Sequence, residues 1–272
     1  MTIVTFNEII RQKKLSLEKT REKIPLNVVK KMAEEAKAGP ELLKVLEHNQ
    51  DLNDLSVIAE YKPVSPSRGL LSSFKVEDVV ETYQKAGVAA ISVLTEEKFF
   101  KSSLENFNAA RSVSLTPLIR KDFIMDDYQI YEARCAGASS LLLMVALYPD
   151  LERGIGLCHD LGMEPLVECA NQEEVKLALE SGAIIIGINN RSFRDFSIDL
   201  NRTFKLAQHV PEDLILVSES GVNGSRDLQL LADFGADGVL VGSSIMTSSS
   251  IPDLQRSIKC LVESSKGVRR GR

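Results

Sequence analysis

The 272-residue sequence predicts an α/β protein, a (β/α)8 TIM barrel with an N-terminal helical extension. From about residue 56 onward, short apolar runs alternate with amphipathic stretches, and there are eight of each. The runs LLLMVAL and AIIIGI are apolar at consecutive positions, which is typical of parallel strands covered on both faces. No break in composition divides the alternation. A doubly wound open sheet is the alternative fold, because alternation alone does not show closure.

Each expected strand is followed by an expected helix. The strands are predicted at 56–62, 89–95, 117–122, 140–147, 165–169, 183–190, 214–220 and 238–243. The helices are predicted at 76–86, 104–113, 126–136, 151–161, 172–180, 199–210, 225–234 and 253–264. Glycines just past the last periodic residue indicate helix C-caps at Gly87, Gly137, Gly162, Gly182 and Gly235. Ser225 and Asp253 are predicted as N-caps.

The first 47 residues lie outside this repeat. We expect an extension at 1–47 and a catalytic barrel at 48–272, which together form a single domain. Two amphipathic helices are predicted at 6–13 and 28–38, separated by a charged segment and Pro25. Their apolar faces favour packing on the barrel. Closing the barrel bottom, mediating assembly and covering the active site stay open as roles.

Composition narrows the class of protein. The chain has 33 basic and 38 acidic residues, a net charge of −5, which disfavours a dedicated nucleic-acid binder. No apolar run is long enough to span a bilayer, and the N-terminus lacks the order of a secretory signal. The four cysteines form no CxxC pair, which argues against a disulfide framework and a zinc ribbon. We therefore expect a cytoplasmic protein that binds neither nucleic acid nor membranes.

Charged and amide side chains stand at the predicted strand ends, where barrel enzymes carry their chemistry. Glu60 and Lys62 are alternate residues of one strand, so both can face the barrel lumen. Lys121, Glu168 and Asn189 end three other strands. Such a set suits general acid/base catalysis on an anionic substrate. The alternative is that these charges form buried salt bridges that only support the barrel.

The last two strand ends indicate a phosphate site. Ser220-Gly221 and Gly242-Ser243 stand where barrel enzymes often bind phosphate with backbone N–H groups. Ser65 follows the first strand, which neighbours the eighth in a closed barrel, and is expected to complete this site. No spacing suits a metal, and GIGLCH lacks the third glycine of a dinucleotide fingerprint. We expect neither a metal nor a cofactor.

Seven segments at these strand ends carry a family resemblance. They are IAEYKPVSPSRG, ISVLTEEKFF, LIRKDFI, MEPLVE, IIGINNRSF, VSESGV and GVLVGSSIM. In this order they resemble the indole-3-glycerol phosphate synthase family, over roughly residues 45–265. The resemblance implies a cofactor-free carboxy-lyase of tryptophan biosynthesis. Its substrate is 1-(2-carboxyphenylamino)-1-deoxyribulose 5-phosphate, and its products are indole-3-glycerol phosphate, carbon dioxide and water.

The resemblance also implies roles for single residues. Lys121 is the expected general acid of ring closure, and Glu168 is expected to stabilise the developing positive charge. Lys62 is expected to bind the substrate carboxylate and to act in dehydration, with Glu60 as a base and Asn189 beside them. The substrate-binding residues implied are Ser65, Phe100, Phe123, Leu142, Arg191, Ser220, Gly221, Gly242 and Ser243.

The sequence departs from the family pattern in three places. Pro63 stands where a basic residue often follows the lysine, and Ser192 replaces a usual aspartate. Lys101-Ser102-Ser103 replaces Asn-Gly-Ser, which leaves the conformation of that loop open. None of these changes touches an expected catalytic residue.

Other functions stay open beside the one that the resemblance implies. They are a related sugar-phosphate isomerase, a Schiff-base aldolase that uses Lys121, and a catalytically silent barrel that binds a phosphate ligand. The expected partner is a small anionic sugar phosphate. Another enzyme of tryptophan biosynthesis is the protein partner to test.

Overall fold

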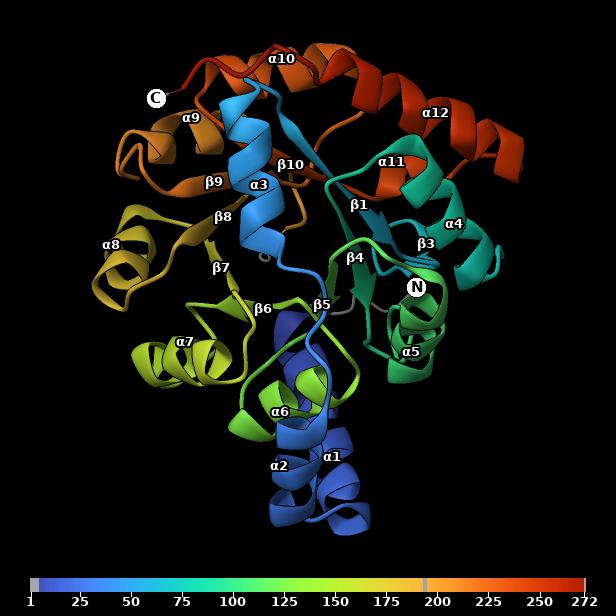
Figure 1. The fold of residues 1–272 in the computed structure, drawn as a ribbon, viewed down its shortest axis with the longest axis vertical. Helices are drawn as coiled ribbons and strands as arrows, with labels where there is room; N and C mark the ends of the chain where they lie inside the picture. Colours follow the sequence, from blue (N-terminus) through green and yellow to red (C-terminus); the bar gives the residue numbers. More distant parts are fainter. Residues whose placement is uncertain (1–4, 193–194, 272) are drawn as a thin grey trace.

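A closed barrel of eight parallel strands forms the centre of the computed structural model, which describes residues 5–192 and 195–271 (Figure 1). Around the barrel the strands follow in the order β1 (Ser56–Tyr61), β10 (Gly238–Val241), β9 (Ile215–Glu219), β8 (Ile185–Asn189), β7 (Leu166–Cys169), β6 (Ser140–Met144), β5 (Leu118–Lys121) and β4 (Ala90–Leu94). Strand β1 pairs in parallel with both β10 and β4, which closes the ring. The predicted barrel is thus confirmed and the open sheet is excluded.

A helix follows each barrel strand and packs on the outside of the barrel (Figure 1). These helices are α4 (Val76–Ala86), α5 (Leu104–Val113), α6 (Asp127–Cys135), α7 (Leu151–Asp160), α8 (Gln172–Glu180), α9 (Asn201–Ala207), α10 (Ser225–Asp233) and α12 (Ile251–Ser264). Outward-facing strand residues such as Ile91, Val167 and Leu216 form one apolar core with them. All five predicted cap glycines have positive φ, as a left-handed C-cap requires.

The predicted N-caps are wrong by one residue for α10 and by three for α12. Gly224 precedes α10, and Ser225 is already the first helical residue. The N-cap of α12 is Ser250, whose hydroxyl accepts the N–H of Asp253. Asp253 thus lies in the first turn, where a carboxylate also favours a helix but by its charge rather than as the cap.

Two short elements at the carboxyl ends of the strands were not predicted. After β1 the chain forms a hairpin of β2 (Val64–Ser65) and β3 (Gly69–Leu70). After β10 it forms the single-turn helix α11 (Ser243–Met246). Neither element is long enough to show a periodic apolar pattern, so sequence periodicity could not reveal them.

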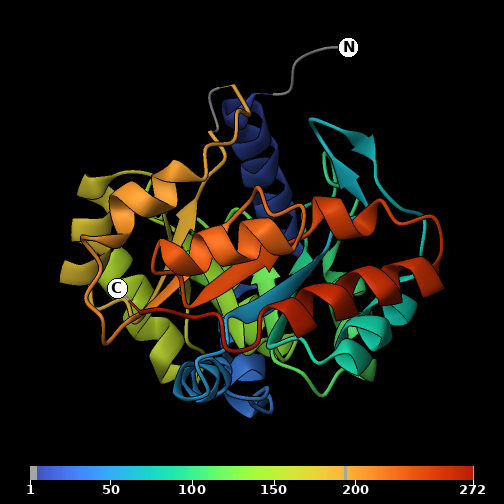
Figure 2. The same cartoon turned by 90° about the horizontal axis from the view of Figure 1, so that it is seen from above.

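The extension forms three helices: α1 (Phe6–Lys23), α2 (Leu26–Glu35) and α3 (Leu42–Asp51). Helix α1 continues through the charged segment because Lys, Glu and Arg are good helix formers, and it ends just before Pro25. Figure 2 shows α1 reaching towards one end of the barrel, whereas α2 and α3 lie at the other. Within the described residues, no helix has the length and apolar composition needed to cross a membrane.

A second apolar core fills the barrel lumen and includes parts of the extension. Leu42 and Leu46 of α3 belong to it, and so does Ile9 of α1, together with strand residues such as Ile58 and Leu142. The extension therefore packs on the barrel, as its apolar faces predicted. The division between residues 47 and 48 stays a prediction, and it falls within α3.

Candidate active site

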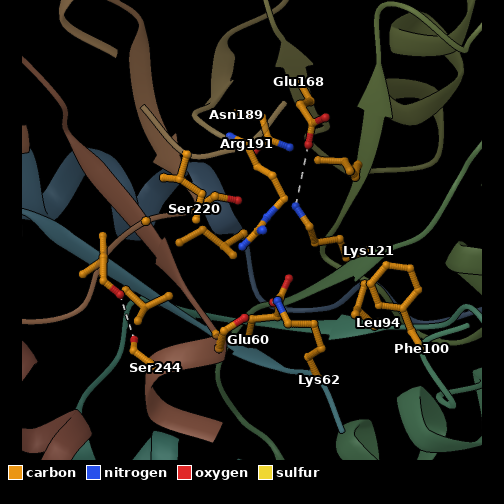
Figure 3. A pocket seen from close by; sticks show the side chains of 18 of the residues that line it. Glu60, Lys62, Leu94, Phe100, Lys121, Glu168, Asn189, Arg191, Ser220 and Ser244 are labelled. Atoms are coloured by element: carbon orange, nitrogen blue, oxygen red, sulfur yellow. Dashed lines mark hydrogen bonds and ion pairs between the residues drawn. The ribbon is translucent and has the colours of Figure 1, made fainter. Parts of the chain in front are cut away.

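A pocket of about 920 Å³, measured with its open mouth, lies at the carboxyl ends of the barrel strands (Figure 3). The predicted site residues that line it are Glu60, Lys62, Phe100, Lys121, Phe123, Leu142, Glu168, Asn189, Arg191, Ser220, Gly221, Gly242 and Ser243. They come from all eight barrel strands or the loops that follow them. The rule that chemistry gathers at strand ends therefore brings these residues to one place.

Ser65 is the predicted site residue that does not line this pocket. It lies buried in β2, where its hydroxyl is 3.1 Å from that of Ser67. The prediction assumed a loop leading from β1 towards the phosphate end, whereas the chain turns into the β2–β3 hairpin. The hairpin instead brings Arg68, for which no role was predicted, to the pocket.

Glu60 and Lys62 form an ion pair at the end of β1. Burial alone would raise the pKa of Glu60, but the positive charges of Lys62 and Lys121 outweigh it, so the pKa lies below its ordinary value. Gly242 of the neighbouring strand end makes this arrangement possible, since a Cβ there would collide with the Glu60 carboxylate. The glycine therefore leaves room for the Glu60 carboxylate.

Lys121 ends β5 and lies between two carboxylates. Its Nζ contacts Glu219 and is 3.8 Å from Oε2 of Glu168, the pair marked in Figure 3. Burial lowers the pKa of Lys121, but the charges of Glu219, Glu168 and Glu60 outweigh it and raise that pKa above its ordinary value. The lysine is therefore protonated at neutral pH.

Glu219 is a site residue that sequence reasoning missed. It ends β9, is buried, and pairs across the sheet with Asn189. The available signal was a glutamate at the end of the apolar run ILVSE, the same pattern that singled out Glu60 and Glu168.

Glu168 is a residue of the pocket whose carboxyl group has a raised pKa. Burial, and next the negative charge of Glu219, raise its pKa to about 7, while Lys121 acts in the opposite direction. A hydrogen bond from the Asn189 side chain also favours the ionised form. A carboxyl group with this pKa can take up and release a proton near neutral pH, as general acid/base catalysis requires.

The far end of the pocket is built from backbone rather than from charge. Ser220 and Gly221 both have positive φ, of 68° and 103°, which is unusual for a serine. The first residues of α11, with Gly242 before them, form the opposite side. Ser244 Oγ donates to the carbonyl of Val222 at 2.8 Å and ties the two loops together. Barrel enzymes bind phosphate with this arrangement of loops and a short extra helix.

The loop after β4 supplies an aromatic wall. The carboxylate of Glu96 accepts the backbone N–H groups of Lys98, Phe99 and Phe100 at 3.1, 2.7 and 2.9 Å. Ser102 donates its hydroxyl to the carbonyl of Leu94 at 2.6 Å. The loop with the unusual Lys-Ser-Ser sequence is therefore fixed at both ends.

Aromatic rings from three elements meet at this wall. The ring of Phe100 lies 6.2 Å from that of Phe123, which lies 5.9 Å from Phe6 of α1. Such tilted and edge-on pairs are favourable beyond their apolar area. Helix α1 thus reaches the rim of the pocket, and an aromatic substrate ring would meet a matching surface.

Arg191 and Arg68 bring positive charge to the same pocket. Burial, together with the charge of Arg68, lowers the pKa of Arg191, whereas Glu60 raises it. Two guanidinium groups that repel each other in one pocket are favourable partners for a bound anion. In the described part of the chain, no group of three or more His, Cys, Asp or Glu side chains is placed to hold a metal ion.

Comparison with known proteins decides the family. The model of the indole-3-glycerol phosphate synthase family matches residues 6–261. The indole-3-glycerol phosphate synthase of Methanothermobacter marburgensis is 41% identical over 263 residues, 97% of this chain and 94% of its own length. That of Acetivibrio thermocellus is 40% identical over 94% of this chain and 99% of its own length. This chain belongs to the indole-3-glycerol phosphate synthase family.

Membership of this family identifies the activity of the protein. It is a carboxy-lyase of tryptophan biosynthesis that acts on a phosphorylated small molecule. The prediction from the strand-end segments is thus confirmed for family, fold and function. The match also begins at residue 6, so the family pattern includes helix α1.

Solved structures of low identity support the fold alone. A tryptophan synthase structure from Mycobacterium tuberculosis has a TM-score of 0.63 at 16% identity, covering 84% of this chain and 99% of that one. A thiamine phosphate pyrophosphorylase from Pyrococcus furiosus has a TM-score of 0.60 at 17% identity, covering 80% of this chain and 98% of that one.

Proposed function

We propose that the pocket at the strand ends is the active site of the indole-3-glycerol phosphate synthase reaction, with Lys121 and Glu168 at its centre. The observation that carries this proposal is the position of Lys121 between Glu168 and Glu219, on the side of the pocket facing the Glu60–Lys62 pair. Two lysines and three glutamates can supply the separate proton transfers that ring closure and dehydration need.

Ring closure joins an aromatic ring carbon to the ketone carbon of the substrate. Lys121, protonated because of the carboxylates around it, donates a proton to the ketone oxygen as the new bond forms. The attacking ring gains positive charge, which the carboxylate of Glu168 stabilises. Oε2 of Glu168 lies 3.8 Å from Nζ of Lys121. Asn189 orients Glu168 through its hydrogen bond.

The later steps need a second acid and a base. Loss of carbon dioxide restores the aromatic ring system, and dehydration then removes the hydroxyl group that ring closure formed. Lys62 binds the substrate carboxylate and donates a proton to the departing hydroxyl, which leaves as water. Glu60, ionised because its pKa is lowered, accepts the proton released from the ring system.

The phosphate and the aromatic ring occupy opposite ends of the pocket. Gly221, Gly242 and Ser243 bind the phosphate through the loop after β9 and the first turn of α11. Phe100 and Phe123, together with Leu142, form the wall for the carboxyphenyl ring. Arg191 adds positive charge between the two ends, and Ser220 lies beside the phosphate loop.

The same geometry disfavours the alternative functions. A Schiff-base aldolase needs a lysine with a lowered pKa, whereas the pKa of Lys121 is raised. A silent phosphate binder has no use for three buried glutamates beside two lysines, because burying these charges is costly. A sugar-phosphate isomerase typically uses a Cys or Asp pair at strand ends, and Cys169 points away from the lumen into the outer core.

The location and the protein partner of the enzyme are also proposals. The described cysteines are all free thiols, one of them exposed, which suits a reducing cytoplasm. The acidic net charge of −5 supports a protein without a nucleic-acid partner. Another enzyme of tryptophan biosynthesis is the natural candidate for a partner, because it would receive or supply the phosphorylated intermediate.

A turnover assay tests the proposed function directly. Purified protein is mixed with 1-(2-carboxyphenylamino)-1-deoxyribulose 5-phosphate in EDTA, and indole fluorescence is followed. We expect product at an enzymic rate that EDTA does not lower. A flat trace with tight binding of the same compound would support a silent binder, whereas a flat trace without binding would contradict the substrate itself.

A further inference from the structure

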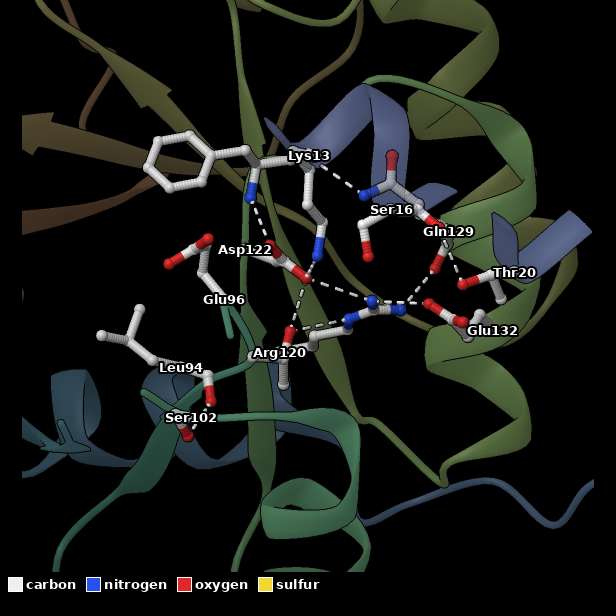
Figure 4. A network of polar contacts seen from close by, with 12 residues as sticks. Lys13, Ser16, Thr20, Leu94, Glu96, Ser102, Arg120, Asp122, Gln129 and Glu132 are labelled. Carbon is white, nitrogen blue, oxygen red and sulfur yellow. Dashed lines mark hydrogen bonds and ion pairs between the residues drawn. The ribbon is translucent and has the colours of Figure 1, made fainter. Parts of the chain in front are cut away.

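Helix α1 carries a lysine that reaches the barrel directly beside the active site (Figure 4). Lys13 Nζ is 2.5 Å from Oδ2 of Asp122, and the side chains of the two residues are 12% and 0% exposed. The pair is therefore largely removed from water, where an ion pair is far more sensitive to the loss of one partner than at the surface.

Asp122 uses both of its carboxylate oxygens. Oδ2 also accepts the hydroxyl of Thr95 at 2.6 Å and Nη2 of Arg120 at 3.1 Å. Oδ1 accepts the backbone N–H of Phe123 at 2.9 Å. Burial raises the pKa of Asp122, but the charges of Lys13 and Arg120 outweigh it and lower that pKa, so the carboxylate stays ionised.

The position of Asp122 in the chain connects this network to the pocket. It follows Lys121 and precedes Phe123, and all three residues line the pocket. A carboxylate held from four directions fixes the backbone at the end of β5. It thereby also fixes the directions of the Lys121 and Phe123 side chains. Lys13 itself is not among the pocket-lining residues, but Asp122, which it contacts, is one of them.

We propose that Lys13 is a positioning residue of the active site, which holds Asp122 and thereby places Lys121 and Phe123. The proposal rests on the catalytic role proposed for Lys121. Without the Lys13 charge, Asp122 and Glu132 share the single cation Arg120, which is 2.6 Å from Glu132. The carboxylate then rearranges or admits water, and the end of β5 moves with it.

A second ion pair between α1 and the barrel provides a matched control. Arg21 contacts Asp126, the N-cap of α6, and their side chains are 40% and 31% exposed. Removing Arg21 also removes an attachment of the helix, but it leaves Asp122 untouched. A lysine that only docked the helix would behave like Arg21, whereas a positioning lysine would not.

The test compares Lys13→Met, Lys13→Arg and Arg21→Met in the full-length chain. In the wild type and each variant, kcat and KM are measured below the onset of thermal unfolding. We expect Lys13→Met to lower kcat about tenfold or more, because small misplacements of a catalytic group are costly, with KM within about threefold. Lys13→Arg keeps the charge and should return kcat to within about threefold of wild type. Arg21→Met should leave kcat within about twofold.

Asp122→Asn extends the test to the mechanism. It should also lower kcat, and adding Lys13→Met to it should cause little further loss, because both changes break the same contact. The double variant leaves no orphaned charge at this pair, so it carries the test where Lys13→Met alone does not fold.

Equal kcat values for Lys13→Met and Arg21→Met would overturn the proposal. So would an Asp122→Asn variant with wild-type kcat, or losses from the two changes that multiply. A wild-type protein without turnover would be a different result, because it would contradict the proposed function rather than the role of Lys13.

Discussion

Two groups of buried charges lie on opposite sides of the end of β5. Consecutive residues of a strand point to opposite faces, so Arg120 faces outward while Lys121 faces the lumen. The outer cluster consists of Lys13, Arg120, Asp122 and Glu132. The pocket cluster consists of Lys62, Lys121, Glu60, Glu168 and Glu219. Both contain the same kinds of side chain, but they differ in the balance of positive and negative charges.

The outer cluster is balanced, with two cations and two carboxylates. Burial lowers the pKa of Arg120, but the charges of Glu132 and Asp122 outweigh it and raise that pKa, so the guanidinium stays charged. Each charge in this cluster thus has a partner, and Arg120 and Asp122 stay charged at neutral pH. Such a cluster fixes geometry and transfers no protons.

The pocket cluster is unbalanced, because two lysines face three glutamates. Arg191 lies at its edge and acts mainly on Glu60. The surplus negative charge falls on Glu168. Burial and the charge of Glu219 raise the pKa of Glu168 to about 7. The comparison teaches that an unmatched carboxylate beside a cavity, rather than buried charge as such, distinguishes the proposed acid/base site.

Loss of Lys121 should produce the largest effect on activity. Lys121→Ala removes the proposed general acid, and we expect kcat to fall by about 10³-fold. Binding of a non-reacting phosphate-containing substrate analogue should stay within a few-fold, because the phosphate loops are unchanged. Steady-state kinetics and calorimetric titration measure the two quantities. Turnover comparable to wild type would refute the role of Lys121.

Loss of Arg120 should instead act on stability. Arg120→Met leaves Asp122 and Glu132 with one cation between them, and we expect about 3–5 kcal/mol less free energy of unfolding. Urea denaturation at pH 7 measures it. Arg11→Met is the control, because Arg11 pairs with Glu8 at the surface with 62% exposure, and its loss should lower the free energy of unfolding far less. Equal losses in the two variants would contradict the distinction between the clusters.

Sequence alone could predict most of the fold and most of the pocket lining, because both depend on local patterns. Consecutive apolar residues indicate strands of a parallel sheet, and the glycines after helices match positive φ in the structure. Once a barrel was predicted, the rule for strand ends placed Glu60, Lys121 and Glu168 together.

The rest depends on contacts that are distant in the sequence. Lys13 and Asp122 are 109 positions apart, and nothing near Lys13 marks it as a buried residue. Ser65 was misplaced because a two-residue strand has no measurable period. A glutamate at the end of β9 was visible in the sequence, but its pairing with Lys121 was not. That ion pair joins β9 to β5 on the opposite side of the barrel.

The unmatched carboxylate of Glu168 should lower the free energy of unfolding by an amount that depends on pH. The pKa of Glu168 is about 7 in the folded chain, against an ordinary value of 4.5. A raised pKa contributes stability that is fully present below about pH 4.5 and is lost as the pH rises through 7. Above pH 7, the folded protein therefore carries a buried carboxylate that lacks a full partner.

Glu168→Gln tests this cost, because glutamine is neutral at every pH and keeps the shape of the side chain. We expect the variant to lose turnover and to gain about 1–3 kcal/mol of unfolding free energy over wild type at pH 8, with the gain shrinking towards pH 5. Urea denaturation at both pH values measures the difference. Glu180→Gln, on the exposed face of α8 with 62% exposure, is the surface control and is measured at the same two pH values. A gain that is the same at pH 5 and pH 8 would mean that Glu168 is matched after all, and that the pocket differs from the outer cluster only in being open.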